Sequence, residues 1–178
     1  MTKQLFNSGW SFALKKIGEK PEAGDYRPVD IPHDWLIHNT RALYADGDGC
    51  YKKIFTVNEI EGRVYILRFD GVYMDSEILL NGERIFECKY GYTTFDVELK
   101  GLREGENVIE VIVHHKSPNT RWYSGAGIFR NVWLTVSGED RIVPDGTYFC
   151  ADLDGDRWAV GIDTEAVGSG EAVIRHTL

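Results

Sequence analysis

The chain of 178 residues has few of the features that mark disulfide-rich or membrane-spanning proteins. Its three cysteines, Cys50, Cys88 and Cys150, are widely spaced and odd in number, which argues against a disulfide framework and a thiolate zinc site. No apolar run approaches the ~20 residues that span a bilayer, and the N-terminal residues form no apolar signal segment. We therefore expect a cytoplasmic protein without a membrane partner.

Positive charge is also in deficit. Lysine and arginine number 20 against 28 aspartate and glutamate residues, so the formal net charge is −8. An acidic surface is not attracted to the phosphates of nucleic acid or to anionic lipid. We therefore expect no nucleic acid among the partners.

Helical signals are missing as well. No stretch of useful length has helical periodicity, no glycine-rich phosphate loop precedes a helix, and no internal repeat is present. Short segments alternate instead, as at Trp10, Phe12 and Leu14, and the Asn-Gly pair at 81–82 is typical of a type I′ hairpin. Regularly spaced short strands predict an all-β fold, with a jelly-roll antiparallel sandwich over residues 1–137.

The remaining segment, residues 138–178, differs in character. Residues 137–145 have the composition of an interdomain linker. Three strands are predicted after it, over residues 146–152, 157–164 and 171–177, with a hairpin turn at Asp154-Gly155.

A cluster that suits a sugar precedes the strand at residues 132–136. Arg121, Trp122 and Tyr123 stand beside a serine and two glycines. Aromatic rings can cover the C–H face of a pyranose, and the planar arginine fork reaches its hydroxyls. From the residues alone, a turn that feeds a buried strand is the commoner explanation of such a cluster.

Several histidines and aspartates could carry chemistry. His33 and Asp34 could act in acid-base catalysis or could tie a loop to backbone groups. His114 and His115 are adjacent in a predicted strand and point to opposite faces, so they cannot form a simple ligand pair. We expect these histidines to be hydrogen-bonded or solvent-facing.

Five ordered segments resemble the N-terminal sugar-binding domain of family 2 glycoside hydrolases, which include β-galactosidases, β-glucuronidases and β-mannosidases. The resemblance implies a galactose-binding-domain-like jelly roll followed by an immunoglobulin-like β-sandwich, of which residues 138–178 would supply only the first strands. The segments are W-x-F at 10–12, V-x-I-P-H-D-W at 29–35, G-x-Y-x-K-x-F at 49–55, the run from L-N-G at 80–82 through G-Y-T-x-F-D-V to the strand at 108–114, and the cluster at 121–132.

The same resemblance locates the chemistry outside this stretch. Retaining glycosidases use two carboxyl groups about 5 Å apart, and in this family both are glutamates on a TIM barrel that would begin after residue 178. No catalytic residue is therefore expected here, and this stretch alone should be inactive. The resemblance implies a β-galactosidase-like parent enzyme in which this domain supports the barrel and lines one wall of its pocket. The candidate substrate-binding residues are Asp46, Asn119, Arg121, Trp122 and Tyr123.

The resemblance also bears on cofactors. It implies Mg²⁺ and Na⁺ for the parent enzyme. β-Galactosidases of the family often carry an acidic residue just ahead of the tryptophan, near a bound cation, where this chain has Asn119 and Arg121. We therefore expect no metal ligand and no cofactor in this stretch.

Two other functions stay open from the sequence. The domain could be an independent carbohydrate-binding module, or a structural interface domain in which Trp122, Tyr123 and Phe129 are buried against the barrel. Exposed aromatic groups and unpaired strand edges favour self-association, so we expect a homo-oligomer.

Overall fold

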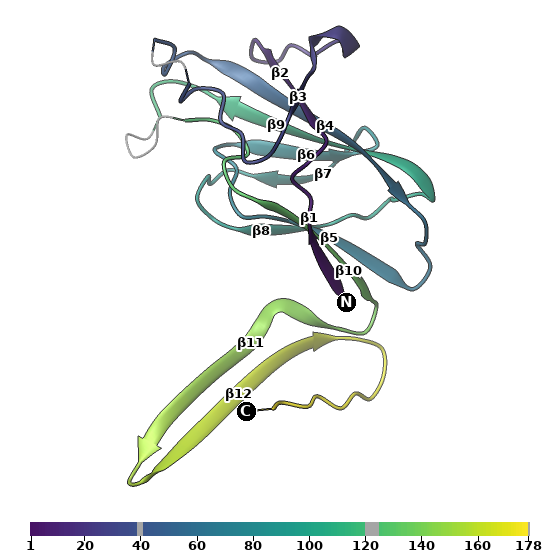
Figure 1. The fold of residues 1–178 in the computed structure, drawn as a ribbon, viewed down its shortest axis with the longest axis vertical. Coiled ribbons are helices and arrows are strands. Elements are labelled where there is room, and N and C mark those ends of the chain that lie inside the picture. The colour runs from purple at the N-terminus through teal and green to yellow at the C-terminus, as the bar shows by residue number, and fades with distance from the viewer. Residues whose placement is uncertain (39–40, 120–124, 178) are drawn as a thin grey trace.

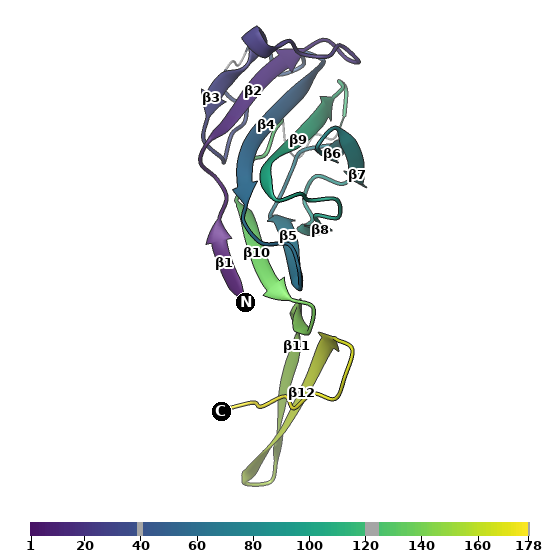
Figure 2. The ribbon, with the colours of Figure 1, turned by 90° about the vertical axis from the view of Figure 1, so that its right-hand side faces the viewer.

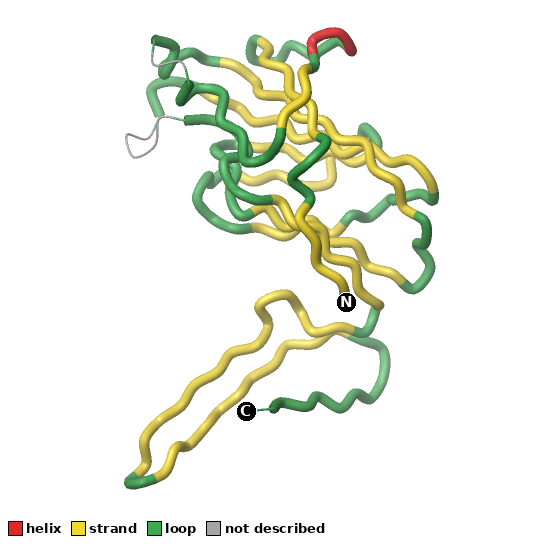
Figure 3. Tube along the Cα trace, viewed as in Figure 1, coloured by secondary structure: helices red, strands yellow, loops and turns green. Residues whose placement is uncertain are grey.

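The computed structural model describes residues 1–38, 41–119 and 125–177 (Figure 1). These residues form twelve strands and one 3-10 turn, η1 at Ala23–Asp25, which confirms the predicted all-β class (Figure 3). The strands are β1 (Thr2–Leu5), β2 (Trp10–Lys15), β3 (Arg27–Val29), β4 (Gly47–Val57), β5 (Arg63–Phe69), β6 (Ser76–Leu80), β7 (Glu83–Cys88), β8 (Phe95–Glu98), β9 (Gly105–His115), β10 (Val132–Gly138), β11 (Arg141–Asp154) and β12 (Arg157–Val167).

Ten of these strands build an antiparallel sandwich. One sheet has the order β3-β2-β4-β9-β6-β7 and the other the order β1-β10-β5-β8. Figure 2 shows the two layers edge on, with the third sheet, β11-β12, extending below them. The predicted sandwich over the first part of the chain is therefore confirmed.

The core lies between the two sheets and follows from the alternation of apolar residues along each strand. The alternation of Trp10, Phe12 and Leu14 predicts one shared, half-buried face of β2, but Leu14 is 52% exposed. Its cross-strand partner is Gly49, which offers no side chain to pack against. The central strands supply the fully buried side chains Tyr51, Leu67, Phe69, Ile78, Ile109, Val111, Val113 and Val132.

The turn between β6 and β7 has the predicted type. Asn81 and Gly82 both adopt positive φ, 52° and 86°, as a type I′ hairpin requires. Asn81 also binds the buried Asn107, with 2.9 Å between its Nδ2 and the Asn107 Oδ1. The hairpin is thereby tied to β9, at the end of the sandwich where that strand begins.

The segment after the sandwich differs from its predicted form. Residues 141–145, expected in a linker, belong to β11, and residues 171–177, expected as a strand, have no strand conformation. The strand β11 bulges between Ile142 and Thr147, where Asp145 has a φ of 58°. Two ion pairs join this region to the sandwich, Arg68–Asp145 at 2.5 Å and Arg141–Glu98 at 3.9 Å. The domain boundary at residue 137 stays a prediction.

A half-buried lysine holds the connection between β1 and β2 on the sheet. Lys53 Nζ donates to the backbone oxygens of Phe6 at 2.9 Å and Ser8 at 2.7 Å. The same ammonium lies 3.4 Å from the centroid of the Phe6 ring. Burial lowers the pKa of Lys53 to about 8.

This pKa predicts a specific pH dependence of stability. Because the pKa of Lys53 in the folded state, about 8, lies below its ordinary 10.5, the unfolded chain binds more protons between these values. Stability should therefore rise with pH through this window. We expect the free energy of unfolding of wild type minus that of Lys53→Met, from urea titrations, to grow as pH rises through about 8. Burial raises the pKa of Cys50 to about 11, which has the opposite effect on stability, but this effect is common to both proteins and cancels when their unfolding free energies are subtracted. An unfolding free-energy difference that does not change with pH would contradict the prediction.

Candidate functional site

One end of the sandwich brings together two segments that carry candidate residues. The strand β4 begins at Gly47 and β9 ends at His115, and these two residues are directly paired. Immediately beyond them, Asp46 Oδ1 accepts a hydrogen bond of 2.6 Å from the backbone N–H of Ser117. The loop before β4 and the segment after β9 are therefore joined at this edge.

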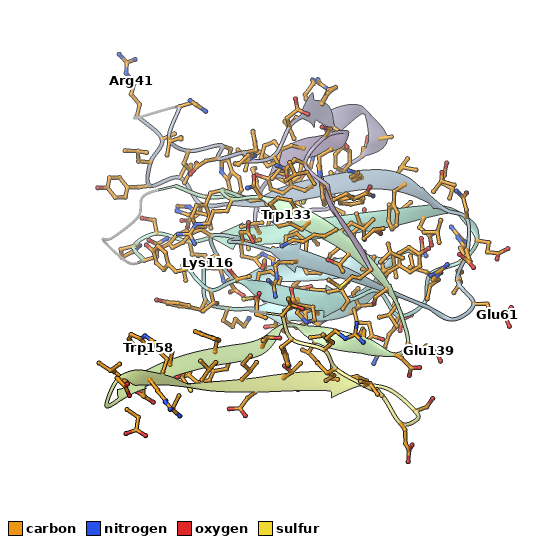
Figure 4. All side chains as sticks on the ribbon, turned by 60° about the horizontal axis from the view of Figure 1, so that its bottom comes forward. Arg41, Glu61, Lys116, Trp133, Glu139 and Trp158 are labelled. Carbon is orange, nitrogen blue, oxygen red and sulfur yellow. The ribbon has the colours of Figure 1, made fainter. Side chains whose placement is uncertain are left out.

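The predicted sugar-contacting residues stand at this end as far as the structure describes them. Asp46 and Asn119 are both exposed. Arg121, Trp122 and Tyr123 lie outside the described residues. Figure 4 shows that the side chains of Arg41 and Lys116 extend from the same end of the molecule, and both are exposed. The end thus presents acidic, basic and amide side chains together.

The loop with the H-D-W motif is fixed by a buried carboxylate. Asp34 is 6% exposed, and its Oδ1 accepts hydrogen bonds from the backbone N–H groups of Leu36 at 2.8 Å, Ile37 at 3.1 Å and Ala126 at 3.1 Å. Backbone bonds from His33 and Trp35 to the segment at 126–128 continue this contact. The interpretation of Asp34 as a residue that ties a loop to backbone groups is supported.

The segment that receives these bonds depends on a glycine. Gly127 has a φ of 140°, and it forms a two-way bridge with Tyr73, with N–O distances of 2.9 and 2.8 Å. A Cβ at this position would overlap the His33 backbone oxygen and the Tyr51 hydroxyl. Only glycine therefore allows the loops at 33–35, 73 and 126–128 to meet so closely.

His33 takes part in the packing of this loop. Burial lowers its pKa below the ordinary value, which favours the neutral ring. Its Nδ1 lies 2.8 Å from the Tyr51 hydroxyl, and Phe12 packs 4.7 Å away between ring centroids. Trp35 stacks on Phe12 at 5.4 Å. The motif thus packs the His33 and Trp35 rings against Phe12.

The histidines at the end of β9 are satisfied, as expected. His114 Nδ1 lies 2.7 Å from Oδ1 of the buried Asp48, whose Oδ2 accepts from the Gly18 N–H at 2.7 Å. His115 Nδ1 lies 2.9 Å from the Ala45 backbone oxygen. Within residues 1–38, 41–119 and 125–177, no three His, Cys, Asp or Glu side chains gather as a metal-binding group. The same ranges contain no helix with the length and apolar character of a membrane-spanning segment.

Sequence reasoning missed Tyr73, which helps to build this end, and it missed the partner of Asp34. Tyr73 is 1% exposed and reaches Phe129 and Tyr92 with its ring, at centroid distances of 6.4 and 5.4 Å. Asp34 bonds Ala126 across 92 positions of sequence. Its place in the H-D-W motif marked Asp34 as a candidate, but no spacing rule links it to residue 126.

A model of the glycosyl hydrolase family 2 sugar-binding domain matches residues 11–137. The chain belongs to this family. The β-galactosidase BoGH2A of Bacteroides ovatus is 36% identical over 161 residues, which cover 80% of this chain and 19% of that protein. A β-glucuronidase of Bacteroides fragilis is 29% identical over 154 residues, which cover 79% of this chain and 21% of that protein.

The solved structures agree with this family 2 assignment. A β-glycosidase from Bacteroides vulgatus superimposes with a TM-score of 0.83 at 27% identity, over 97% of this chain and 25% of that one. The match therefore includes the ribbon β11-β12 as well as the sandwich. The chain spans about a fifth of the length of the curated relatives and about a quarter of this structure.

The geometry limits what this family 2 domain can do chemically. Asp46 and Asn119 offer hydrogen-bonding groups to a polar ligand, whereas the buried Asp34 and Asp48 and the half-buried His114 are occupied by internal partners. Retaining glycosidases need two free carboxyl groups about 5 Å apart. The acidic side chains that carry this end serve loop geometry instead.

Proposed function

We propose that this sugar-binding domain is the non-catalytic N-terminal part of a β-galactosidase-like hydrolase that cleaves β-glycosides. It lines one wall of the substrate pocket with Asp46, Asn119, Arg121, Trp122 and Tyr123, and it packs against a catalytic barrel on the same chain. The observation that carries this proposal is the junction of the loop before β4 with the segment after β9. That junction, made by Asp46 and Ser117, places Asp46 beside the segment that leads to Arg121.

Galactosides are the substrate class that we favour. BoGH2A, a β-galactosidase, is 36% identical, compared with 29% for the B. fragilis β-glucuronidase. A glucuronide carries a carboxylate, which basic side chains such as the exposed Arg41 and Lys116 at this end are suited to bind. A β-glucuronide is therefore the alternative substrate. Hydrolysis rates of the parent enzyme on p-nitrophenyl β-galactoside and p-nitrophenyl β-glucuronide distinguish the two.

Mg²⁺ and Na⁺ belong, in this proposal, to the parent enzyme and not to this domain. The candidate residues that the structure describes offer a cation a single carboxylate, Asp46, whose Oδ1 already accepts from the Ser117 N–H, and no group of three His, Cys, Asp or Glu side chains gathers among the described residues. In the same proposal, residues 138–178 form the first strands of an immunoglobulin-like sandwich that separates the sugar-binding domain from the catalytic barrel. We also propose a cytoplasmic location and a homo-oligomeric state.

The pocket-wall role predicts a kinetic effect of Arg121. In the hydrolase that contains this chain, Arg121→Ala should lower kcat/KM for a β-galactoside about tenfold or more, because a charge-assisted hydrogen bond to a sugar hydroxyl is worth about 1.5–3 kcal/mol. Arg103→Ala is the matched control, since this exposed arginine lies near the start of β9, at its opposite end. Unchanged kcat/KM for Arg121→Ala would refute the role of this residue.

Binding by the isolated domain separates the pocket wall from an independent module. A wall that supplies only part of a site should bind galactose or lactose with a Kd in the millimolar range or weaker. Calorimetric titration of the 178-residue chain measures this directly. Saturable binding in the micromolar range would instead establish a carbohydrate-binding module.

A further inference from the structure

Arg68 connects the ribbon β11-β12 to the sandwich through all three nitrogens of its guanidinium. On the sandwich, its Nε and Nη2 donate to the two carboxylate oxygens of Asp96, at 2.7 and 2.8 Å. On the ribbon, its Nη1 lies 2.5 Å from Oδ2 of Asp145. The Arg68 side chain is only 14% exposed, so it is largely covered where β8 and β11 meet β5. We call Arg68, Asp96 and Asp145 the clamp.

The ribbon reaches Arg68 by means of the bulge in β11. The paired positions on either side of the bulge leave residues 143–146 opposite a single residue of β12, Glu165. The extra length arches toward the sandwich (Figure 1), and it carries Asp145 in a backbone conformation with a φ of 58°. A positive φ is uncommon for residues other than glycine, and bulges often redirect a side chain. The bulge thus directs the Asp145 carboxylate onto the sandwich.

The bulge also covers part of the outer face of the four-stranded sheet. Ile66 and Thr135 are paired across β5 and β10, and the alternation along each strand directs both side chains away from the core. Each is nevertheless only 7% exposed. A small cavity beside them is lined by Pro144 and Asp145 of the bulge and by Arg68. Packing and ion pairs therefore hold the bulge on the same surface.

The geometry of the clamp determines direction more than it adds stability. The Asp145 side chain is 78% exposed, and an ion pair with an exposed partner contributes little to the free energy of folding. The planar fork of arginine, however, binds carboxylates at fixed angles, which the single ammonium of lysine cannot do. Because Asp96 holds the guanidinium from its cross-strand position, the third nitrogen points in a set direction toward the ribbon.

We propose that Arg68 is a positioning residue that sets the angle between the sandwich and the ribbon. The end of the sandwich with Asp46 and Asn119 is thereby held at a fixed place relative to the part of the chain that follows the ribbon. This second step rests on the proposed function, in which that part includes the catalytic barrel. The angle itself is a property of the 178-residue chain and does not depend on any activity.

Residual dipolar couplings of the 178-residue chain test the angle, because two rigidly joined parts share one alignment tensor. Arg68→Lys keeps the charge but loses the planar fork, and Asp145→Asn keeps the shape and the tolerance of positive φ but loses the charge. The matched controls are Arg63→Lys on β5 and Asp152→Asn on β11, both exposed. We expect one common tensor for wild type and both controls, and loss of the common tensor in both test variants.

Two outcomes of this measurement overturn the proposal. One is a common tensor that persists in both test variants, and the other is a wild type whose ribbon and sandwich align separately. Asp145→Asn guards against an Arg68→Lys variant whose sandwich is disturbed, because Asp145 lies on the ribbon and outside the sandwich.

Kinetics of the parent hydrolase test the consequence for the pocket. With p-nitrophenyl β-galactoside, kcat/KM of Arg68→Lys should fall at least about fivefold, because displacement of a substrate contact by about 1 Å can cost far more than that. Arg63→Lys should have the wild-type value. No fall in Arg68→Lys, or an equal fall in both variants, overturns the positioning role. A wild type that hydrolyses neither the galactoside nor the glucuronide contradicts the proposed function instead, and the dipolar couplings still test the clamp.

Discussion

Replacing Gly127 with alanine is expected to lower the free energy of unfolding by about 4 kcal/mol. A φ of 140° is accessible to glycine and strained for alanine. The added Cβ would also overlap the His33 backbone oxygen and the Tyr51 hydroxyl. Because Gly127 exchanges two backbone hydrogen bonds with Tyr73, relief of the overlap would break a buried bridge.

Urea unfolding followed by circular dichroism measures this effect, with Gly24→Ala as the control. A Cβ on Gly24 meets no atom within 4 Å, so that variant should change stability by less than about 0.5 kcal/mol. Equal stabilities of the two variants would show that the loop at 126–128 can move without cost. The close approach of three loops would then not be a requirement of the fold.

The second large effect is expected at Asp34. Asp34→Ala should lower the free energy of unfolding by about 3 kcal/mol, since one buried carboxylate oxygen accepts from the N–H groups of Leu36, Ile37 and Ala126. Removal of the carboxylate leaves these donors without their acceptor in a site that is 6% exposed. Chemical denaturation at neutral pH measures the loss.

Asp30→Ala is the matched control for Asp34→Ala, because Asp30 lies four positions earlier and is exposed. We expect a change below about 0.5 kcal/mol for this control. If Asp34→Ala lowers the free energy of unfolding by less than about 1 kcal/mol, Asp34 is not the residue that joins the loop at 33–35 to the segment at 126–128.

Much of the fold could be predicted from local pattern. The Asn81-Gly82 pair determines its own turn, because both residues accept positive φ more readily than others. The prediction of a strand at residues 171–177 was wrong because a strand forms only where it can pair with a neighbouring strand. Val173 is 94% exposed, and its β propensity has no adjacent strand to pair with.

The candidate site was less predictable for a physical reason. The contacts of Asp46 with Ser117 and of Asp34 with Ala126 join residues 71 and 92 positions apart. Separations of this kind are set by which strands become neighbours in the sheet, here β4 and β9, and not by local spacing. The resemblance to family 2 glycoside hydrolases grouped Asp46 with Asn119 as candidate pocket residues, but it predicted neither of these contacts.

The central claim is that this domain serves a hydrolase whose catalytic machinery follows it on the same chain. Reading the coding DNA beyond the codon for Leu178 tests this claim most directly. We predict an open reading frame that continues through the rest of an immunoglobulin-like sandwich into a barrel with two glutamates at strand ends. A stop codon directly after Leu178 would contradict the claim and leave a sugar-binding domain without catalytic groups.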